Sequence, residues 1–220
     1  MDGNGARFAD LRIHEFVDRL ASAEPVPGGG SASAIAAGLA AALLAMVSRL
    51  SAGRPKYAAY TDVHERVLAT ADAATTRFLA LADEDATAYA AYAAARRLPR
   101  DTAEQQAERD AALRRAAREA SRVPMEVVHE CRRMAAEAEA LAGRSNLNAA
   151  SDVDVAAYLL EAAARGAAAN VLVNLDGIGD AELADQITAE LLAHTAAIEE
   201  LTARTREIVG GGRLREPERA

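Results

Sequence analysis

Apolar residues recur every three or four positions along most of this chain, which is the spacing that gathers side chains on one face of an α-helix. The first such segment spans residues 8–21, and its apolar positions include Ile13, Phe16, Val17 and Leu20. No segment shows the strict apolar–polar alternation of a half-buried β-strand. The pattern predicts an all-α protein, built as a single antiparallel bundle of six to seven helices.

The segment from Ser31 to Leu50 is apolar on most of its faces, which predicts a largely buried helix. It follows the break EPVPGGG, and Ser31 stands where an N-cap residue belongs. The run is rich in alanine rather than leucine, so it suits the interior of a protein better than that of a bilayer. We therefore expect no membrane contact.

Two long helical patterns follow. One runs from about Thr61 to Arg97 and ends before Pro99. The other runs from Asp101 to about Leu141 and contains Pro124, which lacks the N–H that a helix interior needs. We expect this proline to kink the second helix or to split it in two, and the choice decides between six and seven helices.

The last third of the chain predicts two more helices. Ser151 is expected to cap the first of them, because with Asp154 it forms a Ser-x-x-Asp capping pattern. The final helix, from about Ala181 to Val209, carries a seam that suits a partner helix in the same chain or in a second subunit. The seam residues are Ile187, Leu191, His194, Ile198, Leu201, Thr205 and Ile208. Residues 211–220 read as a polar tail, which leaves 1–210 as one helical domain.

Composition and charge exclude several classes of protein. Apolar residues make up 51% of the chain and charged residues 26%, which is the balance of a globular protein. The net charge of −8 argues against a nucleic-acid-binding protein. The single cysteine, Cys131, excludes an internal disulfide and suits a reducing cytosol. The N-terminus lacks the basic-then-apolar pattern of a signal peptide, so we expect a cytoplasmic protein.

Three adjacent glycines, Gly28, Gly29 and Gly30, precede the buried helix. Backbone N–H groups at a helix N-terminus can bind an anion, and glycines let a ligand approach them closely. The motif is not a Walker loop, because no Gly-Lys-Ser/Thr follows, and no strand precedes it as a Rossmann fingerprint requires. The pattern leaves two interpretations open, an anion cradle or a flexible connection between helices.

Asp85 falls on an otherwise apolar helical stripe, whose other members are Phe78, Ala82, Tyr89 and Tyr92. A buried carboxylate is costly unless it is paired, and such a position can shift its pKa toward use as an acid or a base. The alternative is a structural ion pair or a hydrogen bond to a tyrosine.

Asp152 and Asn170 share one face of the second-last helix, with Asn174 close to the same line. At a rise of about 1.5 Å per residue the first two lie roughly 27 Å apart, so they cannot hold one small group together. They could contact two ends of an extended ligand, or belong to sites that a second subunit completes.

Lys56 and Tyr57 stand in the motif GRPKY after the buried helix. Lys56 either interacts with the C-terminal dipole of that helix or binds ligand carboxylates, with Tyr57 beside it as an aromatic platform. The four histidines, His14, His64, His129 and His194, are scattered along the chain. No His-Glu-x-x-His motif is present, so we expect no metal site.

Six motifs together resemble the cyclodeaminase/cyclohydrolase family of folate enzymes. Their order and spacing cover nearly the whole chain, and only the polar tail lies outside the match. One departure is Asp154, where the family pattern has a small residue after SDV. The motifs are PVPGGGSASA (25–34), GRPKY (53–57), LADEDATAY (81–89), SRVPMEV (121–127), SDVDVAA (151–157) and AAANVLVNLDGIGD (167–180).

The resemblance implies an all-α homodimeric enzyme that acts on one-carbon forms of tetrahydrofolate and needs no cofactor beyond that substrate. Cyclohydrolases of the family add water to 5,10-methenyltetrahydrofolate and give 10-formyltetrahydrofolate. Cyclodeaminases close formiminotetrahydrofolate to the methenyl form and expel ammonia, and many are fused to a formiminotransferase domain. The length of this chain leaves no room for that domain, which favours the cyclohydrolase, with the cyclodeaminase as the alternative.

The resemblance also suggests roles for the candidate residues. A carboxylate would stabilise the positive charge of the methenyl carbon and serve as the acid or base, and Asp85 and Asp152 are our candidates. Asn170 and Asn174 would hydrogen-bond the pterin edge. The Gly28–Ser31 cradle or Lys56 would hold the folate carboxylates. The rival from another class is a non-catalytic helical scaffold dimer, which the absence of a cleft beside the glycines would favour.

Overall fold

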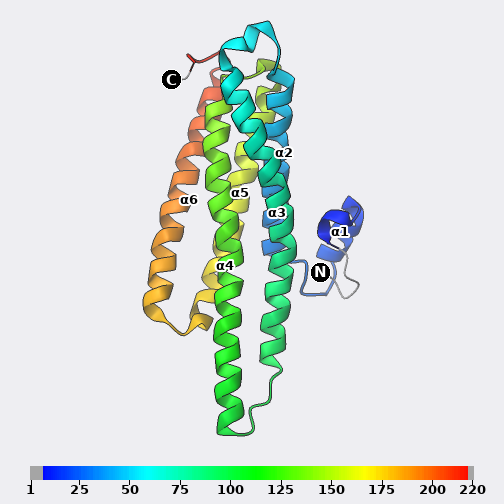
Figure 1. The fold of residues 1–220 in the computed structure, drawn as a ribbon, viewed down its shortest axis with the longest axis vertical. Helices are drawn as coiled ribbons and strands as arrows, with labels where there is room; N and C mark the ends of the chain where they lie inside the picture. Colours follow the sequence, from blue (N-terminus) through cyan, green and yellow to red (C-terminus); the bar gives the residue numbers. More distant parts are fainter. Residues whose placement is uncertain (1–6, 218–220) are drawn as a thin grey trace.

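The computed structural model describes residues 7–217 of the chain, and these residues form six α-helices with no β-strand among them (Figure 1). This confirms the all-α class. The five long helices lie side by side and are joined by short connections, while α1 stands away from the bundle. The helices are α1 (Ile13–Leu20), α2 (Gly29–Ser51), α3 (Thr61–Arg96), α4 (Ala103–Leu141), α5 (Ala150–Leu175) and α6 (Ala181–Gly210).

Helix α2 supplies much of the core, because it packs against both α3 and α5. Its inward side chains are mostly alanine, and Leu44 there is fully buried, as is Phe78 of α3. Small side chains let these helix axes approach closely. In the described part of the chain, α2 is the one helix long and apolar enough to cross a membrane, yet more than half of its most apolar stretch is buried in the bundle.

The start of α2 differs from the sequence prediction. The helix begins at Gly29 with Gly28 as its N-cap residue, so Ser31 lies inside the first turn and is not the cap. Ser31 is fully buried, and its hydroxyl contacts two oxygens of α3 instead of the backbone of its own helix. The cap prediction was wrong because the glycines themselves adopt helical geometry one turn earlier than a sequence rule suggests.

Pro124 does not split α4, which continues as one α-helix through the proline. A proline at this position cannot donate to the carbonyl oxygen of Ala120, four residues earlier. That oxygen instead accepts a hydrogen bond of 3.1 Å from the side-chain amide of Asn174 on α5. A neighbouring helix therefore replaces the missing donor, and residues 7–217 contain six α-helices.

The prediction that Ser151 and Asp154 cap α5 was also wrong. The helix begins at Ala150 with Ala149 as its N-cap residue, and no side chain caps it. A 3₁₀ turn, Leu147–Ala149, leads directly into α5, and the side chain of Asn146 caps that turn by accepting from the Asn148 N–H. The capping function thus lies upstream of the serine.

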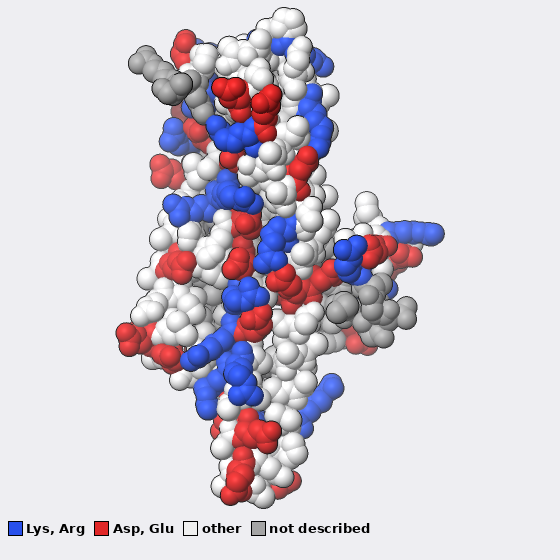
Figure 2. Space-filling view, in the orientation of Figure 1, with Lys and Arg blue, Asp and Glu red and all other residues white. Residues whose placement is uncertain are grey.

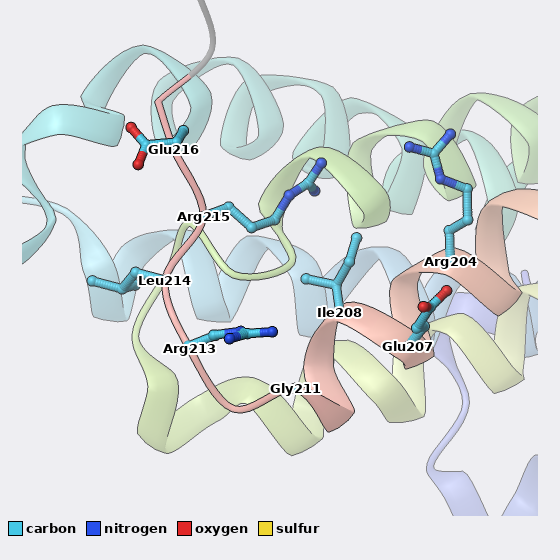
Figure 3. Close-up of a pocket in the computed structure, with 8 residues that line it drawn as sticks. All are labelled: Arg204, Glu207, Ile208, Gly211, Arg213, Leu214, Arg215 and Glu216. Atoms are coloured by element: carbon cyan, nitrogen blue, oxygen red, sulfur yellow. The ribbon is translucent and has the colours of Figure 1, made fainter.

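The seam of α6 packs within the chain, against α4 and α5. Leu191, Ile198 and Thr205 on it are buried. Beyond α6 the tail turns back onto the bundle, where the Arg215 N–H donates to the carbonyl oxygen of Gly143 at 2.8 Å. Figure 3 shows Arg213 and Arg215 projecting from this returning segment beside the end of α6. Residues 218–220 of the predicted tail lie outside the described residues.

Candidate active site

A cavity of about 300 Å³ opens beside the glycine segment and is lined by residues from α2, α3, α4 and α5. It contains most of the residues that the sequence singled out. The lining residues are Pro25, Val26, Gly28, Gly29, Gly30, Asp85, Ala88, Tyr89, Tyr92, Ala120, Asn170, Val173 and Asn174.

Asp85 on α3 is the acidic group of this cavity, and Ser31 is its immediate partner. The Ser31 hydroxyl has one proton, yet it lies 2.9 Å from a carboxylate oxygen of Asp85 and 3.0 Å from the carbonyl oxygen of Ala82. When Asp85 is ionised, these two acceptors compete for that proton. When Asp85 is protonated, it can donate to Ser31 while Ser31 donates to Ala82, so the geometry accommodates the neutral acid.

The electrostatics of Asp85 agree with that arrangement. Burial raises the pKa of Asp85 above its ordinary value, and hydrogen bonds from the Ser31 side chain and backbone oppose the rise. The carboxyl group also lies at the N-terminus of α2, where backbone N–H groups lack partners within the helix. It therefore stands where a capping residue would, and it can change its protonation state more readily than an exposed aspartate at neutral pH.

Gly30 allows the close approach of α2 and Asp85. A Cβ atom at this position would lie 2.6 Å from the Asp85 Cγ and 2.7 Å from its Oδ2, well inside van der Waals contact. At Gly29 the same atom would meet the Asn170 amide at an ordinary 3.5 Å. The glycine segment is thus more than a flexible connection, since one of its members makes room for the carboxylate.

The two asparagines of α5 present their amides along the cavity wall. Asn170 donates to the carbonyl oxygen of Gly166 at 2.8 Å. Asn174 donates to the carbonyl oxygens of Asn170 at 2.7 Å and Ala120 at 3.1 Å. Because both neighbours of the Asn174 nitrogen are acceptors, its orientation is determined, and its side-chain oxygen is the atom that can accept a hydrogen bond from a ligand.

Tyr89 and Tyr92 line the same cavity, although the sequence analysis did not assign them to the site. They follow Asp85 on α3 by one and two helical turns, and Tyr89 is 43% exposed. Their position on the same helical stripe as Asp85 was the sequence feature that could have assigned them to the site. Aromatic rings here offer a flat apolar surface next to the carboxylate.

Asp152, Lys56 and Tyr57 do not line this cavity. They lie toward the other end of α2 and α5, where the Tyr57 ring is buried and its hydroxyl contacts the Asn146 side chain at 3.4 Å. The Lys56 ammonium lies 5.5 Å from the centre of the Tyr57 ring. A single chain therefore brings together the glycines, Asp85 and both asparagines, and it places these three residues apart.

Two of the larger hollows lack comparable chemistry. The groove of Figure 3, about 570 Å³, is formed by the end of α6 and the returning tail and includes none of the predicted site residues. A cleft of about 750 Å³ between α3 and α4 is mainly apolar, and the charged groups on its wall, among them Glu84 and Arg122, pair with one another. Among these three hollows in the described part of the chain, the glycine cavity alone combines a half-buried acid with oriented amides.

Comparison with known proteins gives concordant results. The family model described as formiminotransferase-cyclodeaminase matches residues 12–193. A methenyltetrahydrofolate cyclohydrolase of Methylorubrum extorquens is 36% identical over 191 residues, which is 86% of this chain and 92% of that protein. The formimidoyltransferase-cyclodeaminase of Rattus norvegicus is 34% identical over 171 residues, and the match covers 78% of this chain but only 32% of that longer protein.

Solved structures agree with the sequence comparisons. The crystal structure of formiminotetrahydrofolate cyclodeaminase from Thermotoga maritima superposes with a TM-score of 0.84 at 30% identity, and the match covers 92% of this chain and 98% of that one. The family model, the sequence identities and the structural similarity each extend over most of the chain and agree with one another. This chain therefore belongs to the formiminotransferase-cyclodeaminase family.

Proposed function

We propose that this protein is a folate one-carbon enzyme that hydrolyses 5,10-methenyltetrahydrofolate to 10-formyltetrahydrofolate. The observation that carries the proposal is the half-buried Asp85 carboxyl group in a cavity whose walls also supply two asparagine amides. The related cyclohydrolase of Methylorubrum extorquens, matched over 92% of its length, supports this choice of reaction. A cavity beside the glycines also weighs against a non-catalytic scaffold.

Asp85 would act as the acid–base group of the hydrolysis. The ionised carboxylate stabilises the cationic methenyl carbon and takes a proton from the attacking water. It then returns the proton to N5 as the bond from N5 to that carbon breaks, and the hydroxyl of the adduct loses its proton as the formyl group forms on N10. A raised pKa makes Asp85 a stronger base for the first step, and Ser31 holds it in place.

The other groups of the cavity would position the folate. The Asn174 side-chain oxygen is available to a donor on the pterin edge, and Asn170 lies one turn away on the same face. Tyr89 and Tyr92 offer apolar faces to the ring system. The backbone N–H groups of Gly28–Gly30 would donate hydrogen bonds to polar atoms of the bound folate. Both candidate reactions are additions and proton transfers, so we propose no further cofactor.

The alternative activity is that of a formiminotetrahydrofolate cyclodeaminase. The Thermotoga maritima enzyme favours it, because this chain covers 98% of that structure. A cyclodeaminase therefore exists as a chain with no room for a transferase domain, and chain length does not separate the two reactions. In this reaction N10 would add to the formimino carbon and pass its proton to the formimino nitrogen, and protonated Asp85 would supply the second proton, so that ammonia leaves and the methenyl cation forms.

We further propose that the enzyme is a homodimer joined through α2 and α5. Large apolar side chains on the outer surfaces of these two adjacent helices are exposed, and Val173 is 76% exposed. Figure 2 shows a column of charged groups along the face that α3 and α4 form, and in Figure 1 α2 and α5 lie behind these two helices. The exposed residues are Leu39, Met46, Leu50, Val155, Tyr158, Leu172 and Val173.

This dimer would give Asp152 a catalytic role. In an isologous dimer whose two-fold axis is perpendicular to α5, this helix runs opposite to its own copy, so the beginning of one helix faces the end of the other. Asp152, near the beginning of α5, would then approach the partner's cavity, where Asn170 lies. Lys56 lies toward the same end of the bundle as Asp152 and would contact the glutamate part of a folate bound there, while the buried Tyr57 ring packs next to its ammonium group.

The assay for the main proposal follows the near-ultraviolet absorbance of the methenyl group with purified enzyme. Loss of 5,10-methenyltetrahydrofolate above the uncatalysed rate supports the cyclohydrolase. Appearance of the same absorbance from formiminotetrahydrofolate supports the cyclodeaminase. Asp85→Asn should lower the observed activity by at least about 100-fold. A protein inactive on both substrates would contradict the proposal and favour the scaffold.

The shared site has its own test, in which Asp85→Asn and Asp152→Asn chains are unfolded, mixed in equal amounts and refolded together. If each site takes Asp85 from one chain and Asp152 from the other, mixed dimers regain one intact site, and about a quarter of wild-type activity returns. If both residues act within one chain, no activity returns.

We place the enzyme in the cytoplasm, since its cysteine is a free buried thiol.

A further inference from the structure

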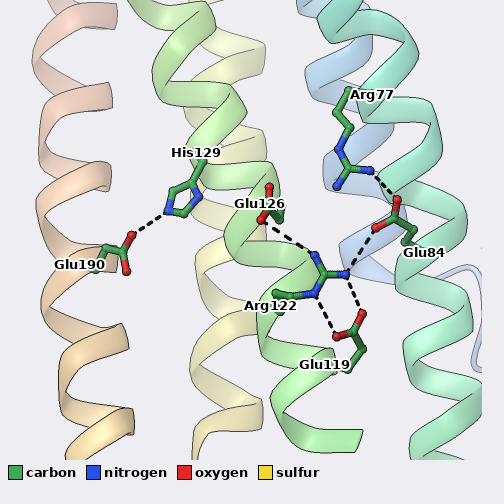
Figure 4. Close-up of polar contacts among 7 residues, drawn as sticks. All are labelled: Arg77, Glu84, Glu119, Arg122, Glu126, His129 and Glu190. Atoms are coloured by element: carbon green, nitrogen blue, oxygen red, sulfur yellow. Dashed lines mark hydrogen bonds and ion pairs between the residues drawn. The ribbon is translucent and has the colours of Figure 1, made fainter.

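Two histidines and a glutamate meet on the surface between α4 and α6, away from the glycine cavity. Glu190 and His194 lie one turn apart on α6, so their side chains point in the same direction. His129 reaches them from α4, and Figure 4 shows its ring directed at Glu190 across the gap between the two helices. The sequence analysis expected no metal site, because spacing within one helix gives no sign of this meeting.

The separations among their ligand atoms match those of a metal centre. The His129 Nε2 lies 3.0 Å from the Glu190 Oε1, and the His194 Nε2 lies 3.6 Å from the same oxygen. All three ligand atoms lie within 4.8 Å of one another. Zinc bonds of about 2.1 Å in a tetrahedron separate neighbouring ligand atoms by about 3.4 Å. An ion between these groups therefore needs only small side-chain rotations.

Solvent reaches the cluster, and one neighbouring cation must move when an ion binds. The side chains of His129, Glu190 and His194 are 36%, 52% and 17% exposed. The Arg132 guanidinium lies 3.1 Å from the His194 Nδ1. When the Nε2 of His194 binds a metal, its Nδ1 carries the ring proton, so Arg132 has to turn away. Arg132 is itself exposed, and nothing in the described residues holds its tip elsewhere.

We propose that His129, Glu190 and His194 bind one divalent transition-metal ion, such as Zn²⁺, which links α6 to α4. Two imidazoles and one carboxylate suit Zn²⁺ or Co²⁺, whereas Mg²⁺ and Ca²⁺ prefer oxygen ligands alone. Water would complete the tetrahedron. The ion would stabilise the folded chain, because its three ligands come from two helices that separate on unfolding.

The experiment uses the full-length, untagged protein after treatment with EDTA and dialysis. Titration with Zn²⁺ is expected to show one ion per chain, and Co²⁺ should give the visible absorption of a tetrahedral site. At a hundredfold excess over the dissociation constant, Zn²⁺ should raise the unfolding midpoint by about 5 °C or more. Absence of stoichiometric binding or of the midpoint shift would overturn the proposal.

Variants locate the ion. His129→Gln, Glu190→Gln and His194→Gln are each expected to weaken Zn²⁺ binding at least tenfold and to abolish the Co²⁺ spectrum. His14→Gln, which removes an exposed histidine of α1, should leave both unchanged. Circular dichroism checks that each variant is folded. Unchanged Zn²⁺ affinity in folded His129→Gln and His194→Gln would overturn the proposal, whatever the folate activity of these proteins.

Discussion

Replacing Gly30 by alanine is expected to disable the active site while leaving the bundle folded. The added Cβ atom would lie 2.6 Å from the Asp85 Cγ and 2.7 Å from its Oδ2, whereas ordinary contact begins at 3.4 Å. Since the surrounding core is close-packed, the short Asp85 side chain has to withdraw by about 1 Å. That movement breaks the 2.9 Å hydrogen bond from Ser31.

The expected cost falls on catalysis more than on stability. A misplacement of about 1 Å at a reacting group can lower a rate on the order of 100-fold. Overpacking costs about 1–3 kcal/mol, while alanine in place of glycine within a helix recovers up to about 1 kcal/mol. The net loss of up to about 2 kcal/mol is small beside a typical stability of about 5–15 kcal/mol.

The assay measures kcat/KM on 5,10-methenyltetrahydrofolate, with urea unfolding beside it. Gly38→Ala is the matched control, because it lies on the same helix and its Cβ would meet the Phe78 Cβ at an ordinary 3.5 Å. We expect wild-type kcat/KM and a gain of up to about 1 kcal/mol in the control. A folded Gly30→Ala protein with kcat/KM within threefold of the wild type would refute the reasoning.

Three further predictions concern stability and assembly. The folded-state pKa of Asp85 is raised, so its contribution to stability is present at low pH and is lost as pH rises through that pKa. The unfolding midpoint of Asp85→Asn minus that of the wild type should therefore increase between pH 4 and pH 8. A difference that stays constant over this range would contradict the direction of the pKa shift. Asn174→Ala removes the donor to the Ala120 carbonyl and should lower the free energy of unfolding by about 1–3 kcal/mol. In a Pro124→Ala background the backbone supplies a donor to the Ala120 carbonyl again, so Asn174→Ala should lower the free energy of unfolding by less. Equal losses in the two backgrounds, measured by urea unfolding, would contradict the view that Asn174 replaces the missing proline N–H. Val173→Glu places a charge on the exposed apolar face of α5 and should shift the sedimentation coefficient from dimer to monomer, whereas an unchanged dimer would exclude this surface as the interface.

The helices were predictable because their signals are local. The apolar repeats and Pro99 gave bounds for α3 and α4 within a few residues of those observed. Asp85 was predictable for a similar reason, since a carboxylate on an apolar stripe stands out within two helical turns.

The errors concern groups whose partners lie far away along the chain. Serine is a residue type favoured at helix N-caps, but the Ser31 hydroxyl contacts α3, more than fifty residues later in the chain. Pro124 would interrupt an isolated helix, but α5 supplies a donor that no local rule can anticipate. The separation of Asp152 from Asn170 was foreseen from helical rise alone, whereas the catalytic role proposed for Asp152 requires a second chain, which one sequence does not describe.

The hydrogen bond from Asn174 to Ala120 also has an evolutionary consequence. Asn174 lines the cavity and at the same time supplies the donor that Pro124 removes from α4. A substitution at 174 that adapts the cavity to a new ligand therefore exposes an unpaired carbonyl as long as the proline remains. The two positions should vary together among relatives, with the loss of proline preceding the loss of asparagine, so a feature of the scaffold limits the order in which specificity can change.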